Sequence, residues 1–170
     1  MNENNVPVIG FVGVQNSGKT TLATKVVAEL TRRGLRVGVV KHTHHFFDLD
    51  KKGKDSWKYT QAGAEAVVLA GDARLTMFAK VVDPELSGSL ALLQDKDVIV
   101  VEGYTRSSHD RIWVYRSAIG GEEKIEPYKE NIVAVACDDN SPLPKVPRLD
   151  IDNVEEVTDF VVRHCGLKTV

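Results

Sequence analysis

The sequence predicts an α/β fold in which a mostly parallel sheet carries helices on both faces and has a local antiparallel extension. Two observations lead to this prediction. Short apolar runs alternate with segments of helical periodicity, and a glycine-rich loop joins the first apolar run to the first helical segment. The chain has 170 residues, about the size of one domain, and no linker-like stretch divides it. We therefore expect a single domain that spans residues 1–170.

The glycine-rich loop is the octapeptide Gly13 to Thr20, GVQNSGKT, which has the complete spacing G-x-x-x-x-G-K-[ST]. It lies between an apolar run, Val8 to Val12, and a helical pattern that ends near Gly34. Glycines allow backbone N–H groups to approach phosphate oxygens, while Lys19 supplies a charge and Thr20 a hydroxyl for Mg²⁺. An ordinary strand-to-helix turn is the alternative. The context favours a phosphate-binding loop, and hence a nucleotide-binding sheet of the P-loop NTPase type.

The other elements follow from periodicity and turn residues. Gly71 and Asp72 form a turn signal between two apolar runs, so these runs are expected to pair as a hairpin and to give the sheet its antiparallel edge. Asp152 or Asn153 can cap the last helix. The remaining predicted strands are 37–40, 66–70, 75–79, 97–102, 112–115 and 132–136, and the remaining predicted helices are 55–62, 84–94 and 154–164.

Glu102 follows four consecutive apolar residues, which predicts that it ends a buried central strand. Open α/β sheets hold ligands at the carboxyl edge of their strands, and a carboxylate oxygen is a ligand that Mg²⁺ prefers. We therefore expect a Mg²⁺ site at Thr20 and Glu102, with the cation held directly or through water. A solvated charge at the end of a strand is the alternative.

A basic, histidine-rich segment, Lys41 to Ser56, follows the second predicted strand and should emerge at the same edge of the sheet. Its histidines, His42, His44 and His45, are of a type that binds zinc, nickel or copper, and they could equally be packed or hydrogen-bonded in a loop. The neighbouring lysines favour a third interpretation, a loop that contacts phosphate or a cofactor. Asp55 could orient Mg²⁺ or water, or oppose the dipole at the start of a helix.

Composition excludes several classes of function. The chain has 22 Lys and Arg against 24 Asp and Glu, a net charge of −2, so no global basic field recruits nucleic acid or a membrane surface. The first residues do not resemble a signal peptide and no run approaches about 18 apolar residues, so a cytoplasmic location is expected. Cys137 and Cys165 lack C-x-x-C spacing, so both are expected to be core or surface residues rather than a disulfide or a zinc site.

Six motifs occur in order over nearly the whole chain: NSGKTTL at 16–22, GVVKHTHH at 38–45, GKDS at 53–56, AGA at 62–64, VEGY at 101–104 and LDIDNV at 149–154. Together they resemble the MobB family of molybdopterin-guanine dinucleotide biosynthesis adaptors. KHTHH and GKDS are far more specific than the phosphate loop alone. The resemblance implies a GTP-binding protein with weak, Mg²⁺-dependent hydrolysis that assists the enzyme attaching GMP to molybdopterin. It also implies a homodimer built partly through extended strands, and it makes a molybdopterin-type cofactor a further candidate ligand.

The resemblance also implies roles for individual residues. It implies a groove between nucleotide and partner lined by His42 to His45 and Lys54 to Ser56. The sequence departs from the family at Thr105, where Lys is common, and the segment 117–130 has no assigned role. The candidate catalytic residues are Lys19, Asp55 and Glu102, the candidate Mg²⁺ ligands are Thr20 and Glu102, and the candidate phosphate- and cofactor-binding residues are Gly13, Gln15, Asn16, Ser17, Gly18, Lys19, Thr20, Thr21, His42, His44 and His45.

Base recognition is predicted at Asp138. This residue follows the apolar run Val133 to Cys137, so it should emerge at the same edge of the sheet as the phosphate loop. A carboxylate there accepts hydrogen bonds from the ring N–H and amine of guanine, which adenine cannot supply. The sequence therefore predicts a preference for GTP over ATP, although it lacks the Asn-Lys-x-Asp pattern of many guanine-specific proteins. The alternative is that Asp138 and Asp139 only begin a turn.

Two other functions remain open at this point. In a small-molecule kinase, Asp55 would act as base for a hydroxyl acceptor held by the histidine-rich loop. In a metal-delivery GTPase, His42, His44 and His45 would be the metal ligands.

Overall fold

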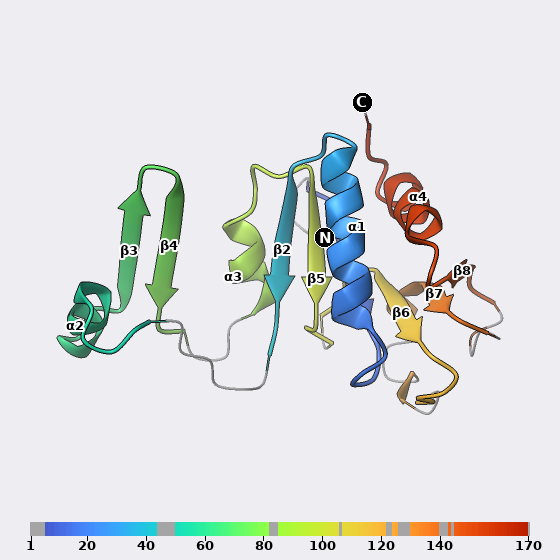
Figure 1. Ribbon diagram of the computed structural model, residues 1–170, viewed down its shortest axis with the longest axis horizontal. Coiled ribbons are helices and arrows are strands. Elements are labelled where there is room, and N and C mark those ends of the chain that lie inside the picture. The colour runs from blue at the N-terminus through green and yellow to red at the C-terminus, as the bar shows by residue number, and fades with distance from the viewer. Residues whose placement is uncertain are drawn as a thin grey trace. The chain divides into compact units, whose positions relative to one another are not determined.

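The computed structural model describes residues 6–43, 50–81, 85–105, 107–121, 124–125, 130–139, 143 and 145–169. The chain divides into two compact units (Figure 1). The sheet unit comprises residues 1–42 and 86–170, and the hairpin unit comprises residues 43–85. Among the described residues, no helix is long and apolar enough to cross a membrane. Both cysteines are free thiols, Cys137 in the core and Cys165 partly exposed.

The sheet unit contains a six-stranded sheet with the strand order β2-β5-β1-β6-β7-β8. Every neighbouring pair of strands in it is parallel. A parallel sheet with both faces covered needs continuous apolar strands, and these runs are what the sequence predicted. The strand β8 was missed because it is short and only its middle residue is apolar and buried. The strands are β1 (Val8–Val12), β2 (Val37–Lys41), β5 (Val98–Glu102), β6 (Arg111–Tyr115), β7 (Ile132–Cys137) and β8 (Arg148–Asp150).

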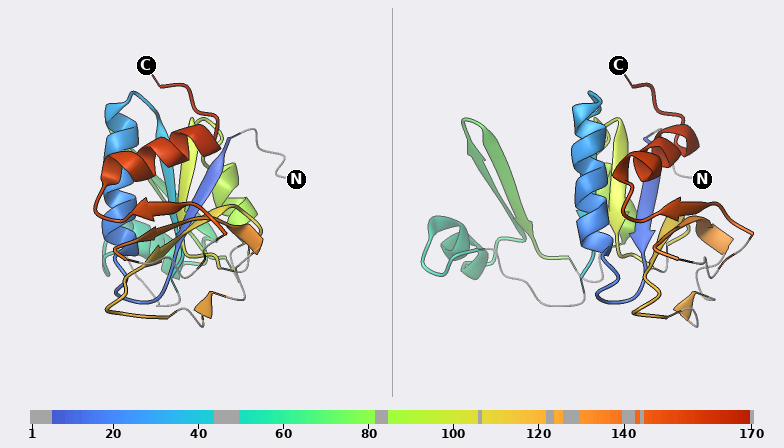
Figure 2. Two further views of the ribbon diagram at one scale, coloured as in Figure 1. Left: turned by 90° about the vertical axis from the view of Figure 1, so that its right-hand side faces the viewer. Right: turned by 45° about the vertical axis from the view of Figure 1, so that its right-hand side comes forward.

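Helices cover both faces of this sheet, as predicted (Figure 2). The helices α1 (Lys19–Arg32) and α4 (Val154–His164) pack on one face, where Val98 and Val100 of β5 are buried. The helix α3 (Leu86–Ala91) packs on the other face, over Val40, Ile99 and Val101. Alternate residues of β5 therefore belong to opposite cores, which explains why its apolar run is unbroken.

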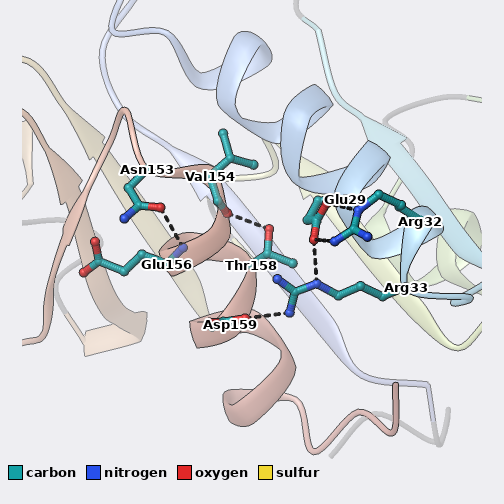
Figure 3. A network of polar contacts seen from close by, with 8 residues as sticks. All are labelled: Glu29, Arg32, Arg33, Asn153, Val154, Glu156, Thr158 and Asp159. Carbon is teal, nitrogen blue, oxygen red and sulfur yellow. Dashed lines mark hydrogen bonds and ion pairs between the residues drawn. The ribbon is translucent and has the colours of Figure 1, made fainter. Parts of the chain in front are cut away.

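The helices α1 and α4 are also joined by polar contacts (Figure 3). Glu29 of α1 accepts a hydrogen bond from Arg33 Nε at 2.8 Å, and Nη1 of the same guanidinium donates to Asp159 of α4 at 2.6 Å. Asn153 caps α4, because its side chain accepts from the backbone N–H of Glu156 at 3.1 Å. The predicted cap is thereby confirmed, and the first turn of α4 is fixed beside the carboxyl end of the sheet.

The hairpin unit consists of α2 (Asp55–Gln61), β3 (Ala66–Gly71) and β4 (Arg74–Ala79). The two strands pair antiparallel in full register, from Ala66 opposite Ala79 to Gly71 opposite Arg74. The hairpin was predicted correctly, but its assignment to an edge of the main sheet was wrong. In the part of the chain that the structure describes, β3 and β4 form a two-stranded sheet of their own. Strand propensity and a turn signal identify a hairpin, but they do not specify which sheet it joins.

Candidate nucleotide site

The phosphate loop leaves β1 at Gly13 and enters α1 at Lys19. A Cβ atom at Gly13, where φ is +150°, would lie 2.3 Å from the carbonyl oxygen of Val114, so only glycine lets the loop pass this close to β6. Asn16 and Gly18 have left-handed φ values of 64° and 93°. Such turns direct backbone N–H groups toward a common point, the arrangement that binds anions at the start of a helix.

The other residues of the motif take up distinct positions around this loop. Gln15 and Asn16 are exposed at its tip, whereas Ser17 is fully buried. Thr20 and Thr21 are exposed in the first turn of α1. The motif therefore combines a solvent-facing loop with one buried residue, Ser17.

Lys19 lies across the loop and donates from Nζ to the carbonyl oxygen of Val14. Burial lowers the pKa of Lys19 from its usual value, the nearby charge of Glu102 opposes that shift, and the charge of Lys41 adds to it. The lysine is thus partly desolvated and held by a neutral carbonyl. A phosphate oxygen at this position would give the ammonium a charged partner in place of Val14.

Thr20, Glu102 and Lys41 meet at the carboxyl edge of the sheet. The Thr20 hydroxyl donates to Glu102 Oε1 at 2.7 Å, and Lys41 Nζ lies 3.3 Å from both Thr20 Oγ1 and Glu102 Oε1. The strand order explains this meeting, because β2 and β1 flank β5 and Lys41 pairs in register with Glu102. The sequence placed Thr20 and Glu102 together, but it did not single out Lys41 as their neighbour.

This donor set fits Mg²⁺. A hydroxyl and a carboxylate oxygen 2.7 Å apart are hard oxygen ligands at hydrogen-bond distance from each other. Magnesium usually takes only one or two protein ligands in such sites and completes its shell with phosphate oxygens and water. In the described ranges, no group of three or more His, Cys, Asp or Glu side chains is placed to hold a metal. A cation at Thr20 and Glu102 would therefore be shared with the nucleotide.

His42 lies directly beyond Lys41 and is fixed by the turn after β5. Its backbone N–H donates to the carbonyl of Glu102 at 2.8 Å, and its ring centroid lies 4.5 Å from that of Tyr104. A Cβ atom at Gly103, where φ is +93°, would lie 2.9 Å from the Cβ of His42, so glycine is required between Glu102 and Tyr104. His44 and His45 lie outside the described residues.

Asp55 belongs to the hairpin unit, where it is the first residue of α2. Its side chain is 84% exposed and pairs with Lys58 at 3.0 Å. The hydrogen bond from Lys58 lowers the pKa of Asp55 below its usual value. A general base works best when its pKa is near the working pH, so this environment does not favour the kinase role considered for Asp55.

Asp138 follows the last residue of β7, at the carboxyl edge of the sheet. Its Oδ1 accepts from the backbone N–H of Ser117 at 2.9 Å, and its Oδ2 lies 3.7 Å from Arg116, which also pairs with Asp152 at 2.8 Å. The Ser117 N–H is the main reason that the pKa of Asp138 is lowered. Arg116 was not among the predicted site residues, because its partners come from two other segments of the chain.

A phosphate loop between the first strand and first helix of a parallel sheet, with a carboxylate from the adjacent strand beside the loop threonine, defines the P-loop NTPase fold. The family model described as MobB, molybdopterin guanine dinucleotide synthesis protein B, matches residues 8–138. The chain belongs to this family.

The comparisons with individual proteins agree with this assignment. The chain is 36% identical to the molybdopterin-guanine dinucleotide biosynthesis adapter protein of Haemophilus influenzae, over 93% of this chain and 89% of that protein. It is 35% identical to the protein of the same name in Escherichia coli, over 92% of each. A crystal structure of molybdopterin-guanine biosynthesis protein B (mobB) is 32% identical, has a TM-score of 0.74, and is matched over 94% of this chain and 99% of that one.

Proposed function

We propose that this chain binds GTP with Mg²⁺ and serves as an adaptor for the enzyme that attaches GMP to molybdopterin, with at most slow GTP hydrolysis. The observation that carries the proposal is the 2.7 Å contact between Thr20 and Glu102 beside Lys19. The names of the relatives indicate the pathway, molybdopterin-guanine dinucleotide biosynthesis. The site of action is the cytoplasm, and the residues that carry the nucleotide site, Lys19, Thr20, Lys41 and Glu102, all belong to the sheet unit.

The charges around the loop suit a triphosphate. Lys19 and Lys41 bring two positive charges to the edge of the sheet, and Glu102 contributes one negative charge. Phosphate oxygens would accept from Lys19 and from the N–H groups at the start of α1. Mg²⁺ bound to Glu102 would replace Lys41 as the positive charge beside that carboxylate. The sum of the charges at the site therefore favours binding of the nucleotide as its magnesium complex.

Slow hydrolysis is consistent with the environment of Glu102. Its Oε1 accepts from Thr20 and pairs with Lys41, so the carboxylate is engaged as an acceptor and is a poor candidate for a base that takes a proton from water. When bound, Mg²⁺ would supply charge stabilisation to the phosphates. Lys19 would position the phosphate chain and add its positive charge to this stabilisation.

The hairpin unit supports the proposed homodimer. Cross-strand partners lie on the same face of a hairpin, and one face of this hairpin consists only of exposed apolar residues. On it, Val68 is 54%, Leu75 69% and Met77 47% exposed. A surface of this kind is typical of a contact with another protein chain. We call it the apolar hairpin face; its members are Ala66, Val68, Ala70, Leu75, Met77 and Ala79.

The test of the proposed site is GTP binding measured by calorimetry over a range of Mg²⁺ concentrations. We expect Glu102→Gln to lose most of the Mg²⁺-dependent part of the GTP affinity, because an amide lacks the charge that a hard cation prefers. Asp97→Asn is the matched control, since Asp97 precedes the same strand at its opposite end and pairs with Arg36 at 2.7 Å. Equal Mg²⁺ dependence in the native chain and in Glu102→Gln would contradict the proposed site.

A further inference from the structure

The segment that follows β6, Arg116 to Gly121, touches the phosphate loop. At Gly121, φ is +101°, and a Cβ atom there would lie 2.4 Å from Val14 Cγ1 and 3.3 Å from Val14 Cγ2. The Gly121 backbone therefore packs directly on the side chain of a residue in the phosphate loop. Any side chain at position 121 would have to displace Val14.

The beginning of this segment is held to the ends of two neighbouring elements. The backbone N–H of Ser117 donates to Asp138 after β7, and Arg116 pairs with Asp152, which directly precedes the cap of α4. A tight turn follows, in which the N–H groups of Ile119 and Gly120 both donate to the carbonyl of Arg116, at 2.9 and 3.1 Å. The segment is thus anchored at one end and in contact with Val14 at the other.

Val14 is the residue through which this contact reaches the nucleotide site. Its carbonyl oxygen accepts from Lys19 Nζ and from the backbone N–H of Ser17. Gly13, just before it, is held against the Val114 carbonyl, since a Cβ there would lie at 2.3 Å. The backbone just before Val14 is therefore confined by β6, and the Val14 side chain is confined by Gly121. A shift of Val14 would move the acceptor that positions Lys19.

We propose that the segment Arg116 to Gly121 is a positioning element for the phosphate loop, with Asp138 as its anchor and Gly121 against Val14 as its contact. A loop already held in its binding conformation loses less conformational entropy when phosphate binds. The segment also connects the strand end that carries Asp138 to the loop that carries Lys19. This proposal rests on the proposed nucleotide binding and assigns a role to a segment outside the phosphate-loop motif.

The test is a double-mutant cycle read by GTP affinity and by the free energy of unfolding. We expect Gly121→Ala to weaken GTP binding about tenfold, because the added methyl displaces Val14. Adding Val14→Ala removes both methyls that the new side chain meets, so the double variant should bind GTP more tightly than Gly121→Ala alone. Val14→Ala by itself should loosen the contact and weaken binding less than Gly121→Ala does.

Gly63→Ala is the matched control for backbone strain. Gly63 has a φ of +106°, close to that of Gly121, but a Cβ atom there would meet nothing within 4 Å. It should lower stability without changing GTP affinity. Native GTP affinity in folded Gly121→Ala would overturn the proposal, and so would a double variant no better than Gly121→Ala. If the native chain itself binds no GTP, the proposed function fails instead. If Gly121→Ala does not fold, native affinity in Val14→Ala overturns the proposal.

Discussion

The strands of the two units differ in the burial of their apolar residues. In the sheet unit, β5 and β6 are buried along almost their whole length, and Val98 to Val101 have no exposed surface. In the hairpin unit, β3 has a single buried residue, Val67, and the apolar hairpin face is exposed. Burial of continuous strands fixes the loops at their ends, whereas an exposed apolar face needs a partner to become buried.

This difference matches the roles proposed for the two units, nucleotide binding for the sheet unit and association with another chain for the hairpin unit. The residues proposed to bind phosphate and Mg²⁺ lie at the ends of buried strands, where positions are rigid. The residues proposed to contact another chain lie on a two-stranded sheet, an element that is marginally stable by itself. The chain has one tryptophan in each unit, Trp113 and Trp57, so variants with a single tryptophan can report on the units separately.

The largest effect is expected from Lys19→Ala. GTP affinity should fall on the order of 1000-fold, about 4 kcal/mol, because the ammonium makes charge-assisted hydrogen bonds to phosphate. The free energy of unfolding should change little, since Lys19 is only half-buried and contacts a loop carbonyl. Calorimetric titration and denaturant unfolding measure the two quantities. Native GTP affinity in the folded variant would contradict the proposed phosphate site. Changed self-association would contradict the proposal that nucleotide binding and self-association belong to different units.

The next largest effect is expected on the free energy of unfolding of the sheet unit as the pH is lowered. His109 is 8% exposed, and burial lowers its pKa to about 4 from a usual value of 6.5. In the described part of the chain neither of its ring nitrogens has a hydrogen-bond partner, and the charge of Arg111 adds to the shift. Between pH 6.5 and 4 the unfolded chain therefore binds more protons, so stability falls as the pH is lowered through this range. The expected loss is about 3 kcal/mol.

Denaturant unfolding followed through Trp113 at several pH values measures this loss. The variant His109→Leu should show a flatter profile between pH 6.5 and 4, because the titrating group is gone. A variant with Trp57 alone reports on the hairpin unit, in which His109 does not lie. The same slope in the native chain and in His109→Leu would assign the pH dependence to other groups.

The apolar hairpin face should control self-association. Leu75→Glu combined with Met77→Lys leaves the net charge unchanged and should weaken the dimer roughly 30-fold, about 2 kcal/mol, through loss of buried apolar area. Sedimentation equilibrium measures the change, and GTP affinity per chain should stay the same. Glu65→Lys with Lys80→Glu is the control, because both lie just outside the strands. An unchanged dimer, or a native chain that is monomeric, would contradict the proposed interface.

Base preference is expected to be a smaller effect. The native chain should bind GTP about 10 to 100 times more tightly than ATP, since a carboxylate left without its donors costs about 1–3 kcal/mol. In Asp138→Asn, preference should move toward xanthosine triphosphate, whose second carbonyl accepts where guanine donates. The asparagine oxygen can still accept from Ser117, which preserves the anchor of the segment after β6. Retained preference for GTP in this variant would show that Asp138 only holds the segment.

The smallest effect on GTP binding is expected from joint replacement of His42, His44 and His45 by Asn. These residues follow a strand end rich in basic side chains, a setting that favours an anionic cofactor or partner over a cationic metal. Retention of the guanylyl-transferring enzyme on immobilised protein should fall about tenfold. Elemental analysis should show no change in metal content. Stoichiometric zinc or nickel in the native chain, lost in the variant, would favour metal delivery instead.

Local sequence signals were enough to predict the parts of the site that lie on one continuous segment. The phosphate loop, the strand that ends at Glu102 and the capped helix from Val154 to His164 all lie where local periodicity predicts them. Local signals suffice there because glycine conformations, apolar runs and caps act over a few residues. The ordered motifs likewise identified the family, which the comparisons confirm.

Which distant segments meet depends on the packing of the whole chain and not on any local pattern. The strand order brings Lys41 to Thr20 and Glu102, and it brings Gly121 against Val14, although more than 100 residues separate the members of the second pair. Within the described residues, the tertiary structure also shows β3 and β4 paired with each other and not with the main sheet. Such contacts depend on how strands are ordered and faces buried across the whole chain. A local pattern carries no information about its distant partner, and for that reason the sequence predicted the elements but not these neighbours.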